Sequence, residues 1–161
     1  MRNAALELFN DRLPLKPYFT DELRYGLRIA GKERALLARY IQFNQPHAQY
    51  WLCFDVDRPG AAIDWSDRNA PAPTLTITNP ENGHAHLLYA LKTSIRTAPD
   101  GKMKPLKYAA AVENALRKKL DADAANLQKS ESRALENRGV AAGTLHAGLA
   151  GRLSRSERSE R

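Results

Sequence analysis

The sequence predicts one α+β domain whose mixed or antiparallel sheet carries helices mainly on one face. Three segments support this class: residues 49–57 form an almost continuous apolar run, residues 74–78 alternate as a strand does, and residues 105–120 repeat at helical spacing. A chain of 161 residues is long enough to bury a hydrophobic core and too short for two large domains.

The N-terminal elements are expected to be short. Residues 12–18 contain two prolines, which remove backbone donors and oppose a helix, so we expect an extended segment. A helical turn is expected to open at Thr20, and the strong helix formers of residues 32–39 predict a second short helix. Residues 40–44 alternate in the manner of a strand, which Pro46 ends.

A central strand and a hairpin are predicted next. The strand at residues 49–57 ends at a proline and a glycine, and the prolines of residues 68–73 indicate a surface loop. Turn-forming residues 79–83 separate two further strand-like segments, 74–78 and 84–91. These two segments are therefore expected to pair as a hairpin.

The most regular helix follows an Asp-Gly turn at residues 100–101. Pro105 suits the first position of a helix. Apolar side chains then fall on one face as far as residue 120: Leu106, Ala109, Val112, Leu116 and Leu120. We expect Tyr108, on the same helix, to be a packing residue.

Composition limits the classes of function. There are 25 Lys and Arg against 18 Asp and Glu, which gives a net charge of +7 and favours a polyanionic partner such as nucleic acid. The one cysteine, Cys53, excludes an internal disulfide and paired-cysteine zinc spacing, and its neighbours suggest a core residue. No apolar run reaches the roughly 20 residues of a membrane span, and no signal peptide is evident, so we expect a cytoplasmic protein without a membrane partner.

Asp55 and Asp57 are the first candidate site residues. Side chains alternate along a strand, so both carboxylates are expected on one face at the end of the apolar run. Two like charges held close together raise one pKa unless a cation compensates, which suggests a divalent metal with hard oxygen ligands. The alternative is that both aspartates lie in water and cap the following turn.

His84 and His86 are the second candidate pair, and the same alternation turns them to one side. Their imidazoles could reach a phosphate or a metal near the carboxylates, or a histidine could simply pack against Tyr89. Positive side chains follow, on a surface that is either solvated or in contact with phosphates: Lys92, Arg96, Lys102, Lys104, Lys107, Arg117, Lys118 and Lys119. No phosphate loop of the Walker type is present.

Several long motifs resemble the plasmid replication initiators of the Replicase family, the RepA-type primases of colicin-plasmid-like replicons. The matching strings are Leu8-Phe-Asn-Asp-Arg-Leu-Pro-Leu-Lys-Pro-Tyr18, Tyr40-Ile-Gln-Phe-Asn44, His47-Ala-Gln-Tyr-Trp-Leu-Cys-Phe-Asp-Val-Asp-Arg-Pro-Gly-Ala-Ala-Ile-Asp64, Asn79-Pro-Glu-Asn-Gly-His-Ala-His-Leu-Leu-Tyr89 and Arg96-Thr-Ala-Pro-Asp100. Such initiators look like members of the archaeo-eukaryotic primase superfamily, whose sites join a strand ending in Asp-x-Asp to a later small-x-His strand and a third acid.

The resemblance implies a primase-like palm and a metal-dependent nucleotidyltransferase. By position, Asp55 and Asp57 match the metal-holding motif and would bind Mg²⁺ or Mn²⁺, and His86, with His84 beside it, matches the histidine motif and would contact a phosphate. The DNA strand would be steadied by Lys102, Lys104 or Lys107. The implied partners are plasmid origin DNA, nucleoside triphosphates and a host DNA polymerase. The third acid has no match.

The C-terminal part of the family pattern is also missing. Residues 139–154 can be encoded by codons whose neighbouring frame reads Val-Trp-Gln-Pro-Glu-Leu-Tyr-Thr-Leu-Asp-Trp-Leu-Ala-Asp-Tyr-Leu, which looks like the family's own continuation, and residues 127–132 recode to Cys-Lys-Asn-Pro-Asn-His. We therefore expect residues 1–124 to be a partial catalytic domain. Residues 125–161 are expected to be a frameshifted, poorly ordered tail, and the chain an inactive fragment.

Two other functions fit parts of the same pattern. His84-Ala-His86 also matches the His-hydrophobic-His pair of rolling-circle nickases, in which Tyr108 would be the nucleophile that attacks a DNA phosphate. That assignment leaves Asp55 and Asp57 without a central role. In a non-catalytic alternative the basic surface only binds DNA or another replication protein.

Overall fold

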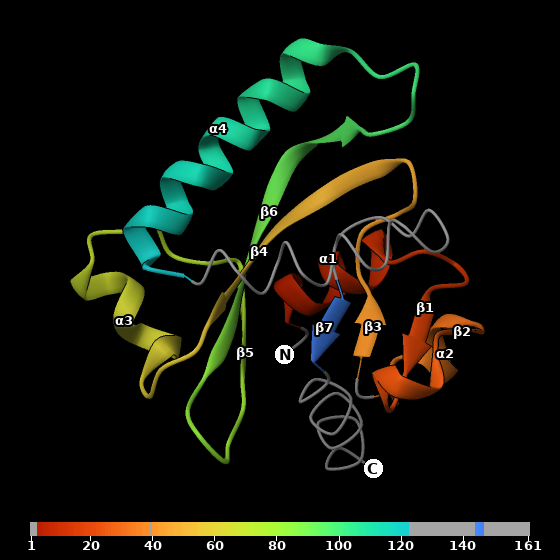
Figure 1. The fold of residues 1–161 in the computed structure, drawn as a ribbon, viewed down its shortest axis with the longest axis horizontal. Helices are drawn as coiled ribbons and strands as arrows, with labels where there is room; N and C mark the ends of the chain where they lie inside the picture. Colours follow the sequence, from red (N-terminus) through yellow and green to blue (C-terminus); the bar gives the residue numbers. More distant parts are fainter. Residues whose placement is uncertain (1–2, 39, 123–143, 147–161) are drawn as a thin grey trace. The chain divides into compact units, whose positions relative to one another are not determined.

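The computed structural model describes residues 3–38, 40–122 and 144–146 (Figure 1). The chain divides into two compact units, one made of residues 1–45 and 142–161 and the other of residues 46–141. Each unit has its own sheet, with strand order β2-β1-β3-β7 in the first and β4-β6-β5 in the second. All the described strand pairs are antiparallel, which confirms the α+β class and selects the antiparallel alternative.

The first unit consists of short elements, as expected. They are α1 (Ala4–Arg12), β1 (Tyr18–Thr20), η1 (Leu23–Tyr25), β2 (Arg28–Ile29), α2 (Lys32–Ala35), β3 (Tyr40–Gln42) and β7 (Thr144–His146). Helix α1 was not expected. It forms because the Asn3 side chain accepts a hydrogen bond from the backbone N–H of Ala5 at 3.0 Å, and because Phe9 is fully buried. The extended segment therefore begins only after Arg12.

The second unit holds all the candidate site residues. Its elements are β4 (Ala48–Val56), α3 (Ala61–Asp67), β5 (Leu75–Thr78), β6 (Ala85–Arg96) and α4 (Met103–Leu120). The expected central strand, hairpin and long helix are all present. Helix α3 was not expected, β6 extends well beyond residue 91, and α4 begins two residues before Pro105, so this proline lies inside the first turn.

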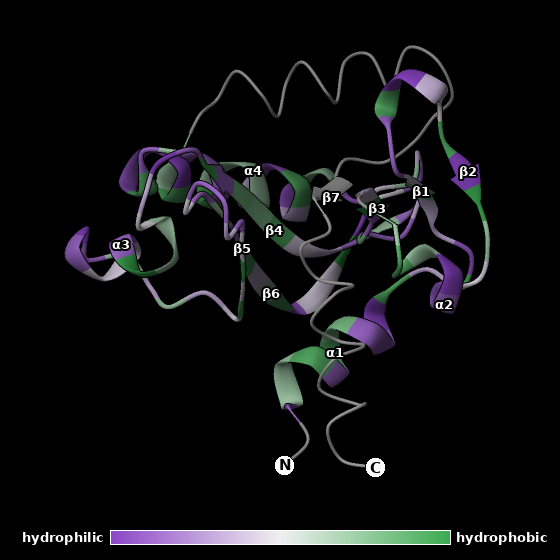
Figure 2. Cartoon of the chain, turned by 90° about the horizontal axis from the view of Figure 1, so that it is seen from below, coloured by the Kyte–Doolittle hydropathy of each residue, from purple (hydrophilic) through white to green (hydrophobic). Residues whose placement is uncertain are grey.

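The two faces of the β4-β6-β5 sheet carry different side chains. Figure 2 shows the strands of this sheet with α3 and α4, coloured by the hydropathy of each residue. On one face, Leu52, Phe54, Val56 and Leu87 pack in a cluster with Ala61 of α3 and Leu120 of α4. We call this the helix-covered face. Val112 and Leu116 pack against the same cluster, which confirms the apolar side predicted for α4. Because side chains alternate along a strand, Asp55 and its register partner His86 belong to the opposite face.

Tyr108 and Cys53 were both expected to be packing residues, and the structure shows how far each is buried. Tyr108 is 74% exposed, so the expectation that it packs on the helix is wrong: it lies on the side of α4 turned away from the sheet. Cys53 is half-buried on β4, and desolvation raises the pKa of its thiol, which keeps the sulfur protonated and unreactive.

Part of the expected tail lies outside the described residues. The exception is β7, whose residues Thr144–His146 pair antiparallel with β3, Leu145 lying opposite Ile41. Within the described ranges, no helix combines the length and apolar character needed to cross a membrane.

The turn after β6 gives a test of this packing. A Cβ atom at Gly101 would lie 2.5 Å from the carbonyl oxygen of Arg96 and 2.9 Å from that of Ala98, closer than carbon and oxygen can approach without a backbone shift. We expect Gly101→Ala to lower the free energy of unfolding by about 1–3 kcal/mol, the usual cost of overpacking. Gly31→Ala is the control, since nothing lies within 4 Å of its Cβ position. Urea denaturation of both variants checks this, and equal stabilities would contradict the described turn.

Candidate functional site

The Asp-x-Asp motif lies where β4 leaves the sheet. Asp55 is the penultimate residue of the strand, and Asp57 is the first residue beyond it. The preceding residues 51–54 are apolar and largely buried, which fixes the strand in the sheet and leaves little freedom in where it ends. Exposure rises along the motif, from 27% for the Asp55 side chain to 42% for that of Asp57.

The histidine motif enters the adjacent strand at the same level. Asp55 pairs with His86 in the β4–β6 register, and His84 precedes β6 by one residue. Nδ1 of His86 lies 3.4 Å from Oδ1 of Asp55, and Nδ1 of His84 lies 3.2 Å from Oδ1 of Asp57. The structure therefore brings the two predicted motifs together as two parallel aspartate–histidine pairs.

The loops that carry the outer pair are held by local turns. Asn79 and Asn82 accept backbone hydrogen bonds from Glu81 and His84 respectively, each at 3.0 Å. Gly83 has a φ of +73°, and its Cβ position lies 3.4 Å from Pro59 Cα, so this turn packs on the loop that follows Asp57. The positive φ and this close approach explain why glycine precedes His84.

The chemistry of each pair follows from the nitrogen that faces the carboxylate. An ionised aspartate only accepts hydrogen bonds, so the imidazole of His84 donates through Nδ1 to Asp57. A carboxylate in this place orients the ring and favours one tautomer. The second nitrogen of the ring, Nε2, is not engaged in this contact with Asp57.

The carboxylates of Asp55 and Asp57 are oxygen donors, the ligand type that Mg²⁺ takes. Within the described residues, no group of three or more His, Cys, Asp and Glu side chains is placed to hold a metal. Mg²⁺, however, is usually held by one or two carboxylates together with substrate phosphates and water rather than by a complete protein cage. Asp55 and Asp57 supply two such carboxylates, and no third acid joins them among the residues the structure describes.

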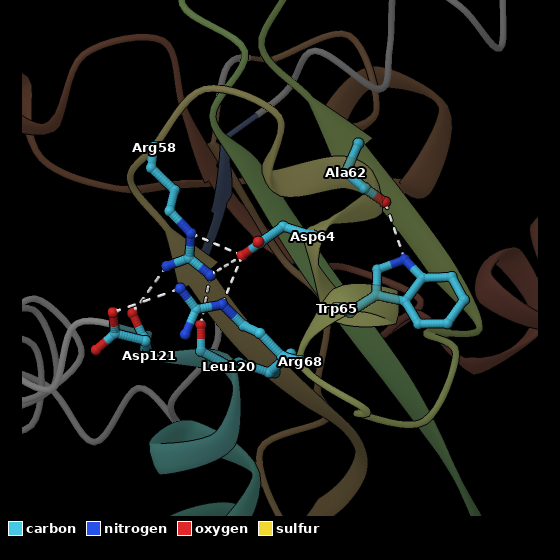
Figure 3. A network of polar contacts seen from close by, with 7 residues as sticks. All are labelled: Arg58, Ala62, Asp64, Trp65, Arg68, Leu120 and Asp121. Carbon is cyan, nitrogen blue, oxygen red and sulfur yellow. Dashed lines mark hydrogen bonds and ion pairs between the residues drawn. The ribbon is translucent and has the colours of Figure 1, made fainter.

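Arg58, which directly follows Asp57, ties the motif to two helices (Figure 3). Its guanidinium donates to Oδ2 of Asp64 on α3, with Nε at 2.7 Å, and to the carbonyl oxygens of Leu120 at 2.6 Å and Asp121 at 3.1 Å. These carbonyls end α4, where the helix dipole favours a cation. The position of Asp57 is thus fixed through its neighbour.

Asp64 is the centre of this network. The Arg58 hydrogen bonds, and then those of Arg68, whose Nε lies 2.7 Å from the same oxygen, hold the pKa of Asp64 below its usual value. Our sequence reasoning missed all three residues. The i,i+4 spacing of Asp64 and Arg68 is a signal for one pair, but nothing local indicates the contact between Arg58 and α4.

The predicted basic residues lie elsewhere in this unit. Lys102 occupies the position before α4 without a side-chain cap hydrogen bond, and Lys104 and Lys107 follow in the first turns of the helix. Because α4 packs on the helix-covered face, these lysines are not brought beside Asp55 and His86. Tyr108 and the histidine pair likewise belong to opposite sides of the sheet, which disfavours the nickase alternative.

Fold and site together define an α+β protein with paired carboxylates and imidazoles on adjacent antiparallel strands. A family model described as the Replicase family matches residues 12–130 of this 161-residue chain. The chain therefore belongs to the Replicase family, and its role is in DNA replication. No curated protein and no solved structure matches it.

The Arg58–Asp64 network predicts a pH-dependent stability. A carboxylate whose pKa is lowered on folding stabilises the native state above the pKa of an unfolded aspartate, about 3.9, and loses this contribution as the pH falls through the folded value. We expect Asp64→Asn to reduce the free energy of unfolding by about 1.5 kcal/mol at pH 7, the lower range for charged hydrogen bonds, because the site is partly solvated.

This difference should shrink as the pH falls below about 4, and urea denaturation at a series of pH values measures it. The control is Asp67→Asn, which removes an exposed carboxylate from the same helix and should change stability little. A difference between wild type and Asp64→Asn that stays constant down to pH 2 would contradict the assigned ion pairs.

Proposed function

We propose that this chain is a RepA-type plasmid replication initiator with a metal-dependent primase site. The observation that carries the proposal is the placement of Asp55 and Asp57 at the end of β4, directly beside His86 and His84 at the start of β6. Family membership alone gives only a role in replication. The paired motifs support nucleotidyl transfer, because that chemistry needs carboxylates beside groups that bind phosphate.

The residues of the site have separable tasks. Asp55 and Asp57 would hold Mg²⁺ or Mn²⁺, which, when bound, neutralises triphosphate charge and activates a 3′ hydroxyl. With both ring nitrogens protonated, His86 would donate from Nε2 to a phosphate oxygen while Asp55 orients the ring through Nδ1. His84, whose side chain is more exposed than that of His86, would contact a phosphate in the same way beside Asp57. Arg58 would fix the position of the neighbouring Asp57 through its hydrogen bonds to α3 and α4, and it need not touch the nucleotide.

The proposal also names binding partners and states that this chain is inactive. The partners would be plasmid origin DNA and nucleoside triphosphates, with a host DNA polymerase extending the primer. Lys102, Lys104 and Lys107 would contact DNA at a distance from the triphosphate, since α4 covers the other face of the sheet. We further propose that a frameshift replaced the family's C-terminal part and left this chain inactive.

A primer-synthesis assay tests the catalytic assignment. In a chain with the C-terminal reading frame restored, we expect Asp55→Asn and Asp57→Asn each to reduce primer formation at least a hundredfold, the scale for losing electrostatic stabilisation of a transition state. Asp67→Asn removes an exposed acid from α3 and serves as the control. Undiminished product from Asp55→Asn would overturn the assignment.

Metal binding can be tested on the chain as it is. If Asp55 and Asp57 bind Mn²⁺, millimolar MnCl₂ should raise the melting temperature, because a ligand that binds only the folded state stabilises it. The Asp55→Asn/Asp57→Asn double variant should show no such rise. A protein that only binds DNA would be indifferent to Mn²⁺, so the same melting temperature with and without Mn²⁺ would favour that alternative.

A further inference from the structure

Helix α4 has an outward surface whose composition the packing of the fold does not explain. Its inward side chains pack on the sheet, as Val112, Leu116 and Leu120 show. Its outward side chains are all exposed. We call this the lysine face, and it consists of Lys104, Lys107, Tyr108, Ala111, Ala115, Lys118 and Lys119.

The charge of the lysine face has one sign. The only acid in α4, Glu113, is on the inward side, where Oε1 lies 3.3 Å from Nη2 of Arg117. Within the described residues, no carboxylate forms an ion pair with the four lysines of this face. Lys118 and Lys119 suit the negative end of the helix dipole. Lys104 lies at the positive end, so helix stability does not account for it.

Tyr108 is the second unexplained feature of this face. It is 74% exposed and lies one turn from Lys104 and one turn from Ala111. A tyrosine on a solvated helix face gives no core packing, whereas its ring is a platform on which an unpaired base can stack. The small side chains Ala111 and Ala115 leave this platform accessible along the helix.

The length of the face also fits a nucleic-acid strand. Residues 104 to 118 span about 21 Å at the rise of an α-helix. At the roughly 3.4 Å spacing of a stacked strand, this length corresponds to about six nucleotides. Cations at both ends and an aromatic ring between them are the features of a surface that tracks a single strand.

We propose that the lysine face of α4 binds single-stranded DNA, with its lysines on phosphates and Tyr108 stacked on an unpaired base. The inference rests on the DNA contact proposed above for Lys104 and Lys107 and deepens it, because it adds Tyr108, Lys118 and Lys119 to that surface and specifies a single strand. It does not depend on metal binding or catalysis. We favour a single strand over a duplex because stacking on Tyr108 requires a base that is not already paired.

Fluorescence anisotropy with a labelled oligothymidylate of 20 nucleotides, measured on the full chain over a salt series, tests this. We expect Lys104→Gln/Lys107→Gln to weaken binding and to reduce the slope of log K against log salt by about 1.4, that is, about 0.7 for each lost phosphate contact. Tyr108→Ala should weaken binding about tenfold with an unchanged slope, and Tyr108→Phe should restore it, because stacking needs the ring and not the hydroxyl.

Lys92→Gln is the matched control, since it removes an exposed charge from β6 rather than from α4. Three results would each overturn the proposal. Tyr108→Ala could bind the oligonucleotide with wild-type affinity, Lys92→Gln could lose as much affinity as the double lysine variant, or the chain could bind a duplex as tightly as the single strand. The two proposals can therefore fail separately. If the lysine face does not bind DNA, the α4 substitutions will leave the oligonucleotide affinity unchanged. If the primase site is wrongly assigned, Asp55→Asn will leave primer synthesis unchanged.

Discussion

The pairing register of β4 with β6 is the constraint on which the candidate site depends. It sets Asp55 opposite His86, and because strands alternate, Asp57 and His84 follow on the same side. A slip of one residue would turn both aspartates toward Leu120 and the apolar cluster, where unpaired carboxylates are costly. Burial of the apolar residues therefore enforces the register that assembles the polar ones.

The second constraint acts between elements rather than along them. Arg58 joins the end of β4 to Asp64 of α3 and to the last carbonyls of α4, so one guanidinium satisfies groups from three elements. Planar, multidentate donation of this kind is what arginine provides and lysine does not. The residue after the Asp-x-Asp motif thus links its geometry to the packing of the helix-covered face.

The two sides of the sheet consequently divide the proposed tasks. One side brings carboxylates and imidazoles together, which suits nucleotide and metal binding. On the other side, α4 buries its apolar stripe and turns lysines and Tyr108 outward, which suits a longer polyanion. Both surfaces agree with the replication role that the Replicase family gives this chain.

The sequence by itself determined the elements and pairings that follow from local periodicity. It predicted the central strand, the hairpin, the apolar side of α4, and the common orientation of Asp55 with Asp57 and of His84 with His86, because these depend only on spacing within one element. It missed α1 and α3, which are short and are stabilised by a cap or by packing of Phe9 and Ala61. Only the tertiary structure decided that the two polar pairs meet, that Arg58 reaches a helix end more than sixty positions away, and that Tyr108 faces outward. Such contacts depend on register and packing between distant segments, which no local pattern encodes.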